Sequence, residues 1–92
     1  MIATFRHRGL RRLYADDDAR GVSGVHARRI RLILAALDAA ETIEAMDVHT
    51  FRLHALKGDL AGFWAVTVQA NWRIIFRFVA GMAHDIDLVD YH

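Results

Sequence analysis

The side chains best suited to chemistry in this chain are its six histidines and its twelve Lys and Arg residues. The histidines are His7, His26, His49, His54, His84 and His92. None of them forms the i, i+4 or His-x-His pair that commonly holds a metal ion, so we expect no metal site. The chain has no cysteine, and its single serine, Ser23, is expected to cap a helix. Thiolate and serine nucleophiles are therefore not expected, and no motif indicates a cofactor.

Cations, imidazoles and the phenol of Tyr91 are instead suited to a polyanion. Cleavage of RNA without a metal needs a base for the 2′-hydroxyl proton, cations for the charge on phosphorus and an acid for the leaving oxygen. The net charge is only +1, but residues 1–31 hold eight Arg and three Asp, whereas residues 32–51 hold four acids and no Lys or Arg. This asymmetry fits a polyanionic or acidic partner, and fits a solvated helix face equally well.

Apolar residues at helical spacing predict two helices in the N-terminal half. The stripe of the first is Leu10, Leu13 and Tyr14. The second is expected to begin after Ser23 as its N-cap. Its buried stripe is Ile30, Ile33, Leu34 and Leu37. Residues 2–5 predict a short strand, and a short turn is expected after Thr42.

Strict alternation from residue 51 onward predicts four strands, at about 51–54, 64–69, 72–79 and 83–89. Opposed residues of an antiparallel pair share a face, so the loops need odd lengths. Three-residue loops at 69–71 and 80–82 place Thr67 opposite Arg73 and Arg77 opposite Asp85. Tyr91 then lies on the face that carries Arg73.

These elements predict an α+β fold, a single domain over residues 1–92 in which N-terminal helices pack on one face of a small, mainly antiparallel sheet. The opposite face is expected to be open and polar, with Arg52, His54, Thr67, Arg73 and Arg77. The large aromatic residues Trp64, Trp72, Phe76 and Phe78 are assigned to the core. The longest apolar run is six residues, against about 20 for a membrane helix, and no signal peptide is evident, so we expect a cytoplasmic protein.

Several short motifs together carry a resemblance to one family. They are Phe5-Arg6-His7-Arg8-Gly9-Leu10, Leu53-His54-Ala55-Leu56-Lys57-Gly58-Asp59, Trp64, Asn71-Trp72-Arg73-Ile74 and Asp90-Tyr91-His92. Over essentially its whole length the chain resembles the HigB-type toxins of the RelE/ParE superfamily. It departs from that family at Ala55, where a proline is usual, and this loosens the loop that bears Lys57.

The resemblance implies a RelE/ParE-like fold and the toxin of a type II toxin–antitoxin system, a ribosome-dependent endoribonuclease that cuts mRNA in the decoding (A) site. Its implied partners are the ribosome, mRNA and a helix-turn-helix antitoxin of the HigA type, with the toxin alone monomeric and the complex oligomeric. The implied catalytic residues are His54, Arg73, Asp90, Tyr91 and His92, with Lys57 at the substrate. Which imidazole is the base stays open.

Outside this cluster, Asn71 either serves its tight loop, which we favour, or reaches a base edge of the substrate. The helix arginines are expected to contact the ribosomal RNA backbone. They are Arg8, Arg11, Arg12, Arg28 and Arg29. Two alternatives stay open: a ParE-like toxin that inhibits gyrase without a nucleolytic cluster, and a non-catalytic module that binds nucleic acid or protein without cutting it.

Overall fold

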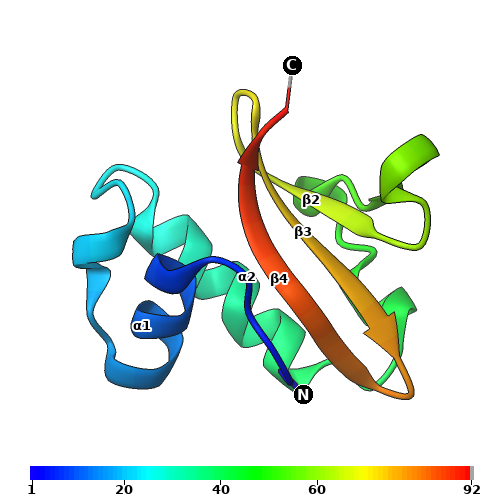
Figure 1. The fold of residues 1–92 in the computed structure, drawn as a ribbon, viewed down its shortest axis with the longest axis horizontal. Coiled ribbons are helices and arrows are strands. Elements are labelled where there is room, and N and C mark those ends of the chain that lie inside the picture. Colours follow the sequence, from blue (N-terminus) through cyan, green and yellow to red (C-terminus); the bar gives the residue numbers. More distant parts are fainter. Residues whose placement is uncertain (92) are drawn as a thin grey trace.

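The computed structural model describes residues 1–91, which form two α-helices and a four-stranded antiparallel sheet (Figure 1). The helices are α1 (Arg8–Asp16) and α2 (Ala27–Ala39). The strands are β1 (His54–Ala55), β2 (Trp64–Gln69), β3 (Trp72–Val79) and β4 (Met82–Asp90), in the order β1-β2-β3-β4. Both helices pack on one face of this sheet, which confirms the predicted α+β arrangement. None of the described helices has the length and apolar character to cross a bilayer.

The main core lies between the helices and that sheet face. The predicted stripe of α2 is buried, and Leu10 and Leu13 of α1 pack against it. The sheet contributes Val66, Ile74, Phe76 and Ile86. Each fully buried side chain of this size contributes about 1.5–3 kcal/mol, so this layer holds the helices against the strands.

α1 begins where the backbone of two glycines meets. His7 is its N-cap, and the His7 Nδ1 atom accepts a hydrogen bond of 3.1 Å from the Leu10 N–H. A Cβ atom on Gly9 would lie 2.2 Å from the Gly21 carbonyl oxygen, so only glycine allows this approach. The first turn of α1 is thereby held against the 3₁₀ turn at Ala19–Gly21.

α1 and α2 are also joined through one carboxylate. The Tyr14 hydroxyl donates a 3.0 Å hydrogen bond to Asp38 Oδ1, which also accepts from the Ile2 N–H at 3.2 Å. This bond to Asp38 raises the pKa of the Tyr14 phenol above its usual range. Tyr14 is thus half exposed, at 42%, rather than buried with the other members of its stripe.

The predicted N-cap of the second helix is wrong. α2 begins at Ala27, with His26 at the N-cap and no side chain capping it. Ser23 lies one turn earlier, where its carbonyl accepts a 3.0 Å hydrogen bond from the His26 N–H. A turn over residues 24–26 therefore separates the serine from the helix that it was expected to cap.

The hairpin loops are shorter than predicted, and their lengths are even, so the prediction of odd loop lengths is wrong. Gln69 pairs with Trp72 and Val79 with Met82, so each turn has two residues instead of three. An extra residue in β2 restores the register, and Thr67 faces Arg73 as predicted. β4 also has an extra residue, near Asp85, whose φ is 55°. Because of this bulge, Arg77 pairs with His84 instead of with the predicted partner Asp85.

Two predicted strands are reduced. Residues 2–5 run beside β4 (dark blue in Figure 1) but form only isolated parallel bridges, Ile2 with Ala83 and Phe5 with Ile86. The strand predicted at 51–54 begins only at His54, because the 3₁₀ turn His49–Phe51 ends in Arg52 with a left-handed φ of 52°.

Candidate active site

The sheet face away from the helices divides into three zones along the strands. At the end near the Ala70–Asn71 turn lie Thr67 and Arg73, with His54 at the β1 edge. In the middle a small second apolar cluster forms. Its members are Leu56, Phe63, Ala65 and Ile75, with Leu60 and Val89 packed against it. The loop between β1 and β2 thus covers part of the face and leaves the polar end accessible.

The third zone is an ionic group at the opposite end. Arg77 Nη1 lies 3.4 Å from Asp85 Oδ2, so the predicted facing of these side chains holds even though the strand register differs. Arg6 lies 4.0 Å from the same carboxylate, and its guanidinium stacks 5.1 Å from the Phe63 ring centre. The ion pairs with Asp85 and the contact with Phe63 explain the positions of these charged side chains.

Arg73 is held in place by the turn that precedes it. Its Nη1 atom donates to the carbonyl of Ala70 and, at 3.1 Å, to that of Trp72. Its Nε atom is buried and makes no hydrogen bond within the described residues. An unpaired buried N–H costs free energy. The second terminal nitrogen, Nη2, makes no hydrogen bond among the described residues and can donate to an acceptor such as an anionic oxygen.

The chain end up to Tyr91 is tied to the same turn. Asp90 is paired with Trp72 across β3 and β4, and the Tyr91 N–H donates a 2.8 Å hydrogen bond to the Asn71 carbonyl. Because Val89 faces Arg73, Tyr91 lies two residues further along on the face of Arg73. Its side chain is 51% exposed. His92, the last predicted catalytic residue, lies outside the described residues.

His54 is oriented by a backbone contact. Its Nδ1 atom lies 3.0 Å from the carbonyl oxygen of Arg52, which can only accept, so Nδ1 carries the proton of this bond. A neutral His54 then has an unprotonated Nε2 that can take up a proton. Strand geometry puts the His54 backbone about 12 Å from that of Arg73, two strands and two residues away. Lys57 is exposed just beyond β1, at the start of the Gly58–Leu60 turn.

The site is therefore an open arrangement. Within residues 1–91, the side chains of His54, Arg73 and Tyr91 make no hydrogen bonds to one another, and no group of three metal-ligating side chains forms. A substrate that spans the sheet from β1 to β3 would be contacted by an imidazole, a guanidinium and a phenol on one face. Such a set can exchange protons and stabilise negative charge.

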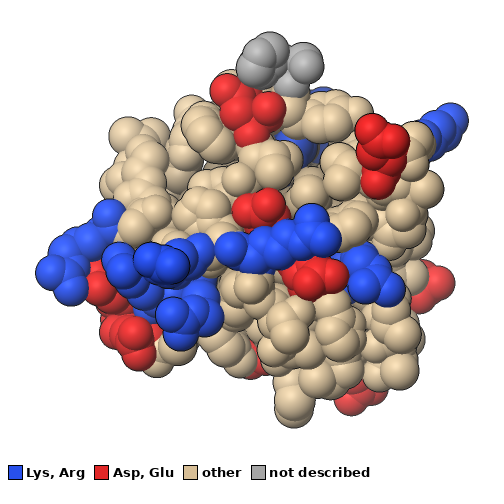
Figure 2. Space-filling model, in the orientation of Figure 1, with Lys and Arg blue, Asp and Glu red and all other residues tan. Residues whose placement is uncertain are grey.

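The predicted ribosomal contacts separate into two groups. Arg8, Arg11, Arg12 and Arg28 are exposed and pair with no side chain in the described part of the chain. Figure 2 shows basic side chains gathered over α1, at the left of this face.

Arg29 differs from these four. Its Nη2 atom donates to the carbonyls of Thr50 and, at 3.1 Å, Thr67, and its guanidinium stacks on Phe51 at 5.1 Å. We therefore assign Arg29 to packing α2 on β2 and no longer count it among the contacts to ribosomal RNA.

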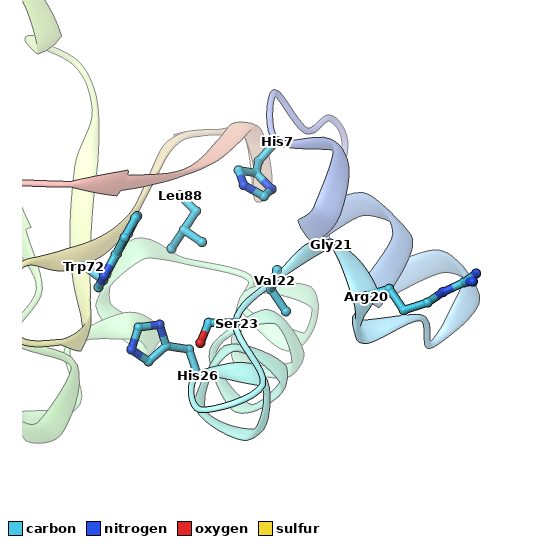
Figure 3. Close-up of a pocket in the computed structure, with 8 residues that line it drawn as sticks. All are labelled: His7, Arg20, Gly21, Val22, Ser23, His26, Trp72 and Leu88. Atoms are coloured by element: carbon cyan, nitrogen blue, oxygen red, sulfur yellow. The ribbon is translucent and has the colours of Figure 1, made fainter.

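Of the four large aromatic residues assigned to the core, Phe76 is buried and Trp64 and Phe78 pack against the core, but the assignment of Trp72 is wrong. Trp72 is 36% exposed and lines a hollow with His7 and His26, on the helix side of the sheet (Figure 3). Strand alternation correctly places Trp72 on the core face, but the helices leave part of its indole uncovered. No signal in the local sequence reports that gap.

Comparison with known proteins identifies the class of protein to which this fold and this polar strand end belong. The family model described as the RelE-like toxin of the type II toxin–antitoxin system HigB matches residues 3–92. The chain belongs to this HigB-like toxin family.

One relative supports the assignment, and one solved structure has a similar fold. The chain is 41% identical over 92 residues to the endoribonuclease HigB of Proteus vulgaris, with both chains fully covered. Its fold is similar to a chain of the YoeB–YefM complex from Staphylococcus aureus, with a TM-score of 0.60 at 15% identity, covering 100% of this chain and 95% of that one.

Proposed function

We propose that this toxin is an endoribonuclease that enters the decoding site of the ribosome and cuts the mRNA held there. The observation that carries the proposal is the position of His54, with Nε2 available, on the same sheet face as Arg73 and Tyr91. The curated relative from Proteus vulgaris is named an endoribonuclease, which supports the same chemistry.

The proposed reaction is attack of a ribose 2′-hydroxyl on the adjacent phosphorus, without a metal. The P–O2′ bond forms, the P–O5′ bond breaks, and the products are a 2′,3′-cyclic phosphate and a 5′-hydroxyl. His54 and His92 share the removal of the 2′ proton and the protonation of the leaving oxygen. Arg73 and Lys57 stabilise the charge that grows on the phosphoryl oxygens, and Asp90 and Tyr91 orient the imidazoles.

The partners follow from this assignment. The side chains of Arg8, Arg11, Arg12 and Arg28 bind ribosomal RNA through its phosphates. Membership of a toxin–antitoxin family implies an antitoxin. We propose that it is a helix-turn-helix protein of the HigA type, that the free toxin is a monomer in the cytoplasm and that the complex is oligomeric. Asn71 is exposed in the Ala70–Asn71 turn, so we also propose that its side chain contacts the substrate.

Induced expression with mapping of mRNA 5′ ends tests the function. We expect cuts in the coding frame, the disappearance of these cuts when translation initiation is blocked, and rescue by the antitoxin. Single-turnover cleavage on programmed ribosomes tests the site: His54→Ala and His92→Ala should each slow cleavage by about 100-fold or more. Intact mRNA with DNA damage signalling would instead indicate gyrase inhibition, and near wild-type rates for both variants would reject the assigned residues.

A further inference from the structure

A hollow of about 460 Å³ lies between the start of α2 and the ends of β3 and β4 (Figure 3). It is on the helix side of the sheet, opposite the catalytic side chains but at the same end of the strands. The residues that line it are His7, Arg20, Gly21, Val22, Ser23, His26, Trp72 and Leu88. Its volume is within the range of small-ligand sites, roughly 300–1,000 Å³.

One wall of the hollow is aromatic. The Trp72 indole is 36% exposed, and its ring centre lies 6.2 Å from that of His26, tilted by 57°. Figure 3 shows both rings facing the hollow from opposite elements, β3 and the start of α2. An exposed indole beside an imidazole offers a flat stacking surface that any planar ring can use.

The remaining walls offer polar groups without negative charge. His7 Nδ1 accepts from the Leu10 N–H, so Nε2 carries the proton of the neutral ring and can donate. The His26 imidazole and the Ser23 hydroxyl make no hydrogen bond among the described residues, and no carboxylate lines the hollow. Arg20 points away in Figure 3 and is held by Asp18 at 2.8 Å.

The hollow lies at the same end of the sheet as the catalytic face, and this position indicates which ligand would bind in it. Trp72 stands between Asn71 and Arg73 in β3 and pairs with Asp90 in β4. Successive residues of a strand point to opposite faces, so Arg73 serves the catalytic side while Trp72 serves the hollow. A strand of RNA that passes over this sheet end can place a phosphate at Arg73 and a neighbouring base on Trp72.

We propose that this hollow is a base-binding subsite, in which Trp72 and His26 stack a nucleobase of the mRNA near the scissile phosphate and His7 and Ser23 contact its edge. The proposal rests on the proposed function. Stacking on aromatic side chains with hydrogen bonds to base edges is how proteins hold unpaired RNA bases. A protein partner fits less well, because a standard interface needs about 800 Å² from each side and this hollow has the size of a small-ligand site.

The test combines a protein change with a base deletion. Programmed ribosomes carry mRNAs with one abasic nucleotide, moved through the A-site codon and the codon after it. Single-turnover cleavage is measured for wild type, Trp72→Leu and Trp72→Phe. Val79→Ala is the matched control, because Val79 is an exposed apolar residue at the other end of β3. Cleavage by His26→Ala is measured as well, and this variant tests the subsite if Trp72→Leu does not fold.

We expect one abasic position to slow wild-type cleavage by about ten-fold, and Trp72→Leu to slow cleavage of intact mRNA by about the same factor. The two changes together should cost no more than either alone. Trp72→Phe should stay within about three-fold of wild type, and Val79→Ala should be unchanged.

Three results would contradict the base-binding subsite. Cleavage could be insensitive to every abasic position, or the effects of Trp72→Leu and of base loss on the cleavage rate could multiply. Alternatively, Trp72→Leu could weaken antitoxin binding while cleavage stays normal. The last result would assign the hollow to the antitoxin. Failure of the proposed function is distinct from these, because wild type would then leave intact mRNA uncut.

Discussion

Arg73 illustrates how one residue of this site depends on its neighbours. The Ala70 and Trp72 carbonyls hold one end of its guanidinium, and the buried Nε has no partner among the described residues. The planar Arg73 guanidinium is therefore anchored at one nitrogen atom and can still bind an anion through another nitrogen atom. Lysine has the same charge but a single flexible ammonium, so it cannot serve both tasks.

Arg73→Lys should therefore reduce single-turnover cleavage by about 100-fold or more at saturating toxin, since loss of one aligned donor at a developing oxyanion has about that cost. The matched control is Arg77→Lys. Arg77 is on the same strand and face but is paired with Asp85 at an exposed position, where ion pairs contribute little. Arg77→Lys should leave cleavage near the wild-type rate, and an equally small effect of Arg73→Lys would show that Arg73 acts only through its charge.

At the scale of elements, the start of α1 depends on backbone contact with the Ala19–Gly21 turn. A Cβ on Gly9 would meet the Gly21 carbonyl oxygen at 2.2 Å, and a Cβ on Gly21 would meet the Gly9 Cα at 2.5 Å. Neither backbone can move without displacing the helix. This contact also sets where His7 stands at the edge of the hollow.

We expect Gly9→Ala to lower the free energy of unfolding by about 1–3 kcal/mol, as overpacking does, and to lower the Tm by roughly 4–8 °C for each kcal/mol. Gly24→Ala is the control, because nothing lies within 4 Å of the added Cβ. Its Tm should stay within about 3 °C of wild type. Thermal unfolding by circular dichroism measures both, and similar stabilities would contradict the close packing.

Across the whole molecule, the net charge of +1 conceals which cations are available to a partner. Arg20 and Arg31 are paired with Asp18 and Asp17, at 2.8 and 3.0 Å. The bonds from Arg20 hold the pKa of the Asp18 carboxyl well below its usual range, so this pair stays charged at neutral pH. Arg11 and Arg12 form no ion pair within 4 Å in the described part of the chain, although the charge of Arg12 also helps to lower the Asp18 pKa.

Arg11→Gln with Arg12→Gln should therefore weaken ribosome binding and reduce the slope of log Kd against log salt by about 1.5, since each phosphate contact contributes about 0.7–0.9. Cleavage at saturating toxin should be unchanged. Arg20→Gln with Arg31→Gln removes the same charge but should change the slope by less than about 0.5. Identical slopes for the two double variants would show that only net charge matters.

Much of this architecture was predictable because it depends on local spacing. The stripe Ile30 to Leu37 determined the buried face of α2, and strand alternation placed Thr67, Arg73 and Tyr91 together. The parity of that register was right although both turns were shorter than expected, because a β-bulge in each hairpin compensates for the missing loop residue. The resemblance to the family predicted the remaining site residues, but it did not predict their positions in space.

The amino-acid sequence by itself determined the elements, the sheet face that each strand residue takes and the family, since these follow from periodicity and short motifs. Only the tertiary structure decided that Arg29 is held by the carbonyls of Thr50 and Thr67, that α2 starts at Ala27 and that Trp72 is left partly exposed beside His26. These outcomes depend on which distant segments come into contact, and spacing along one segment carries no information about where its neighbour in space ends.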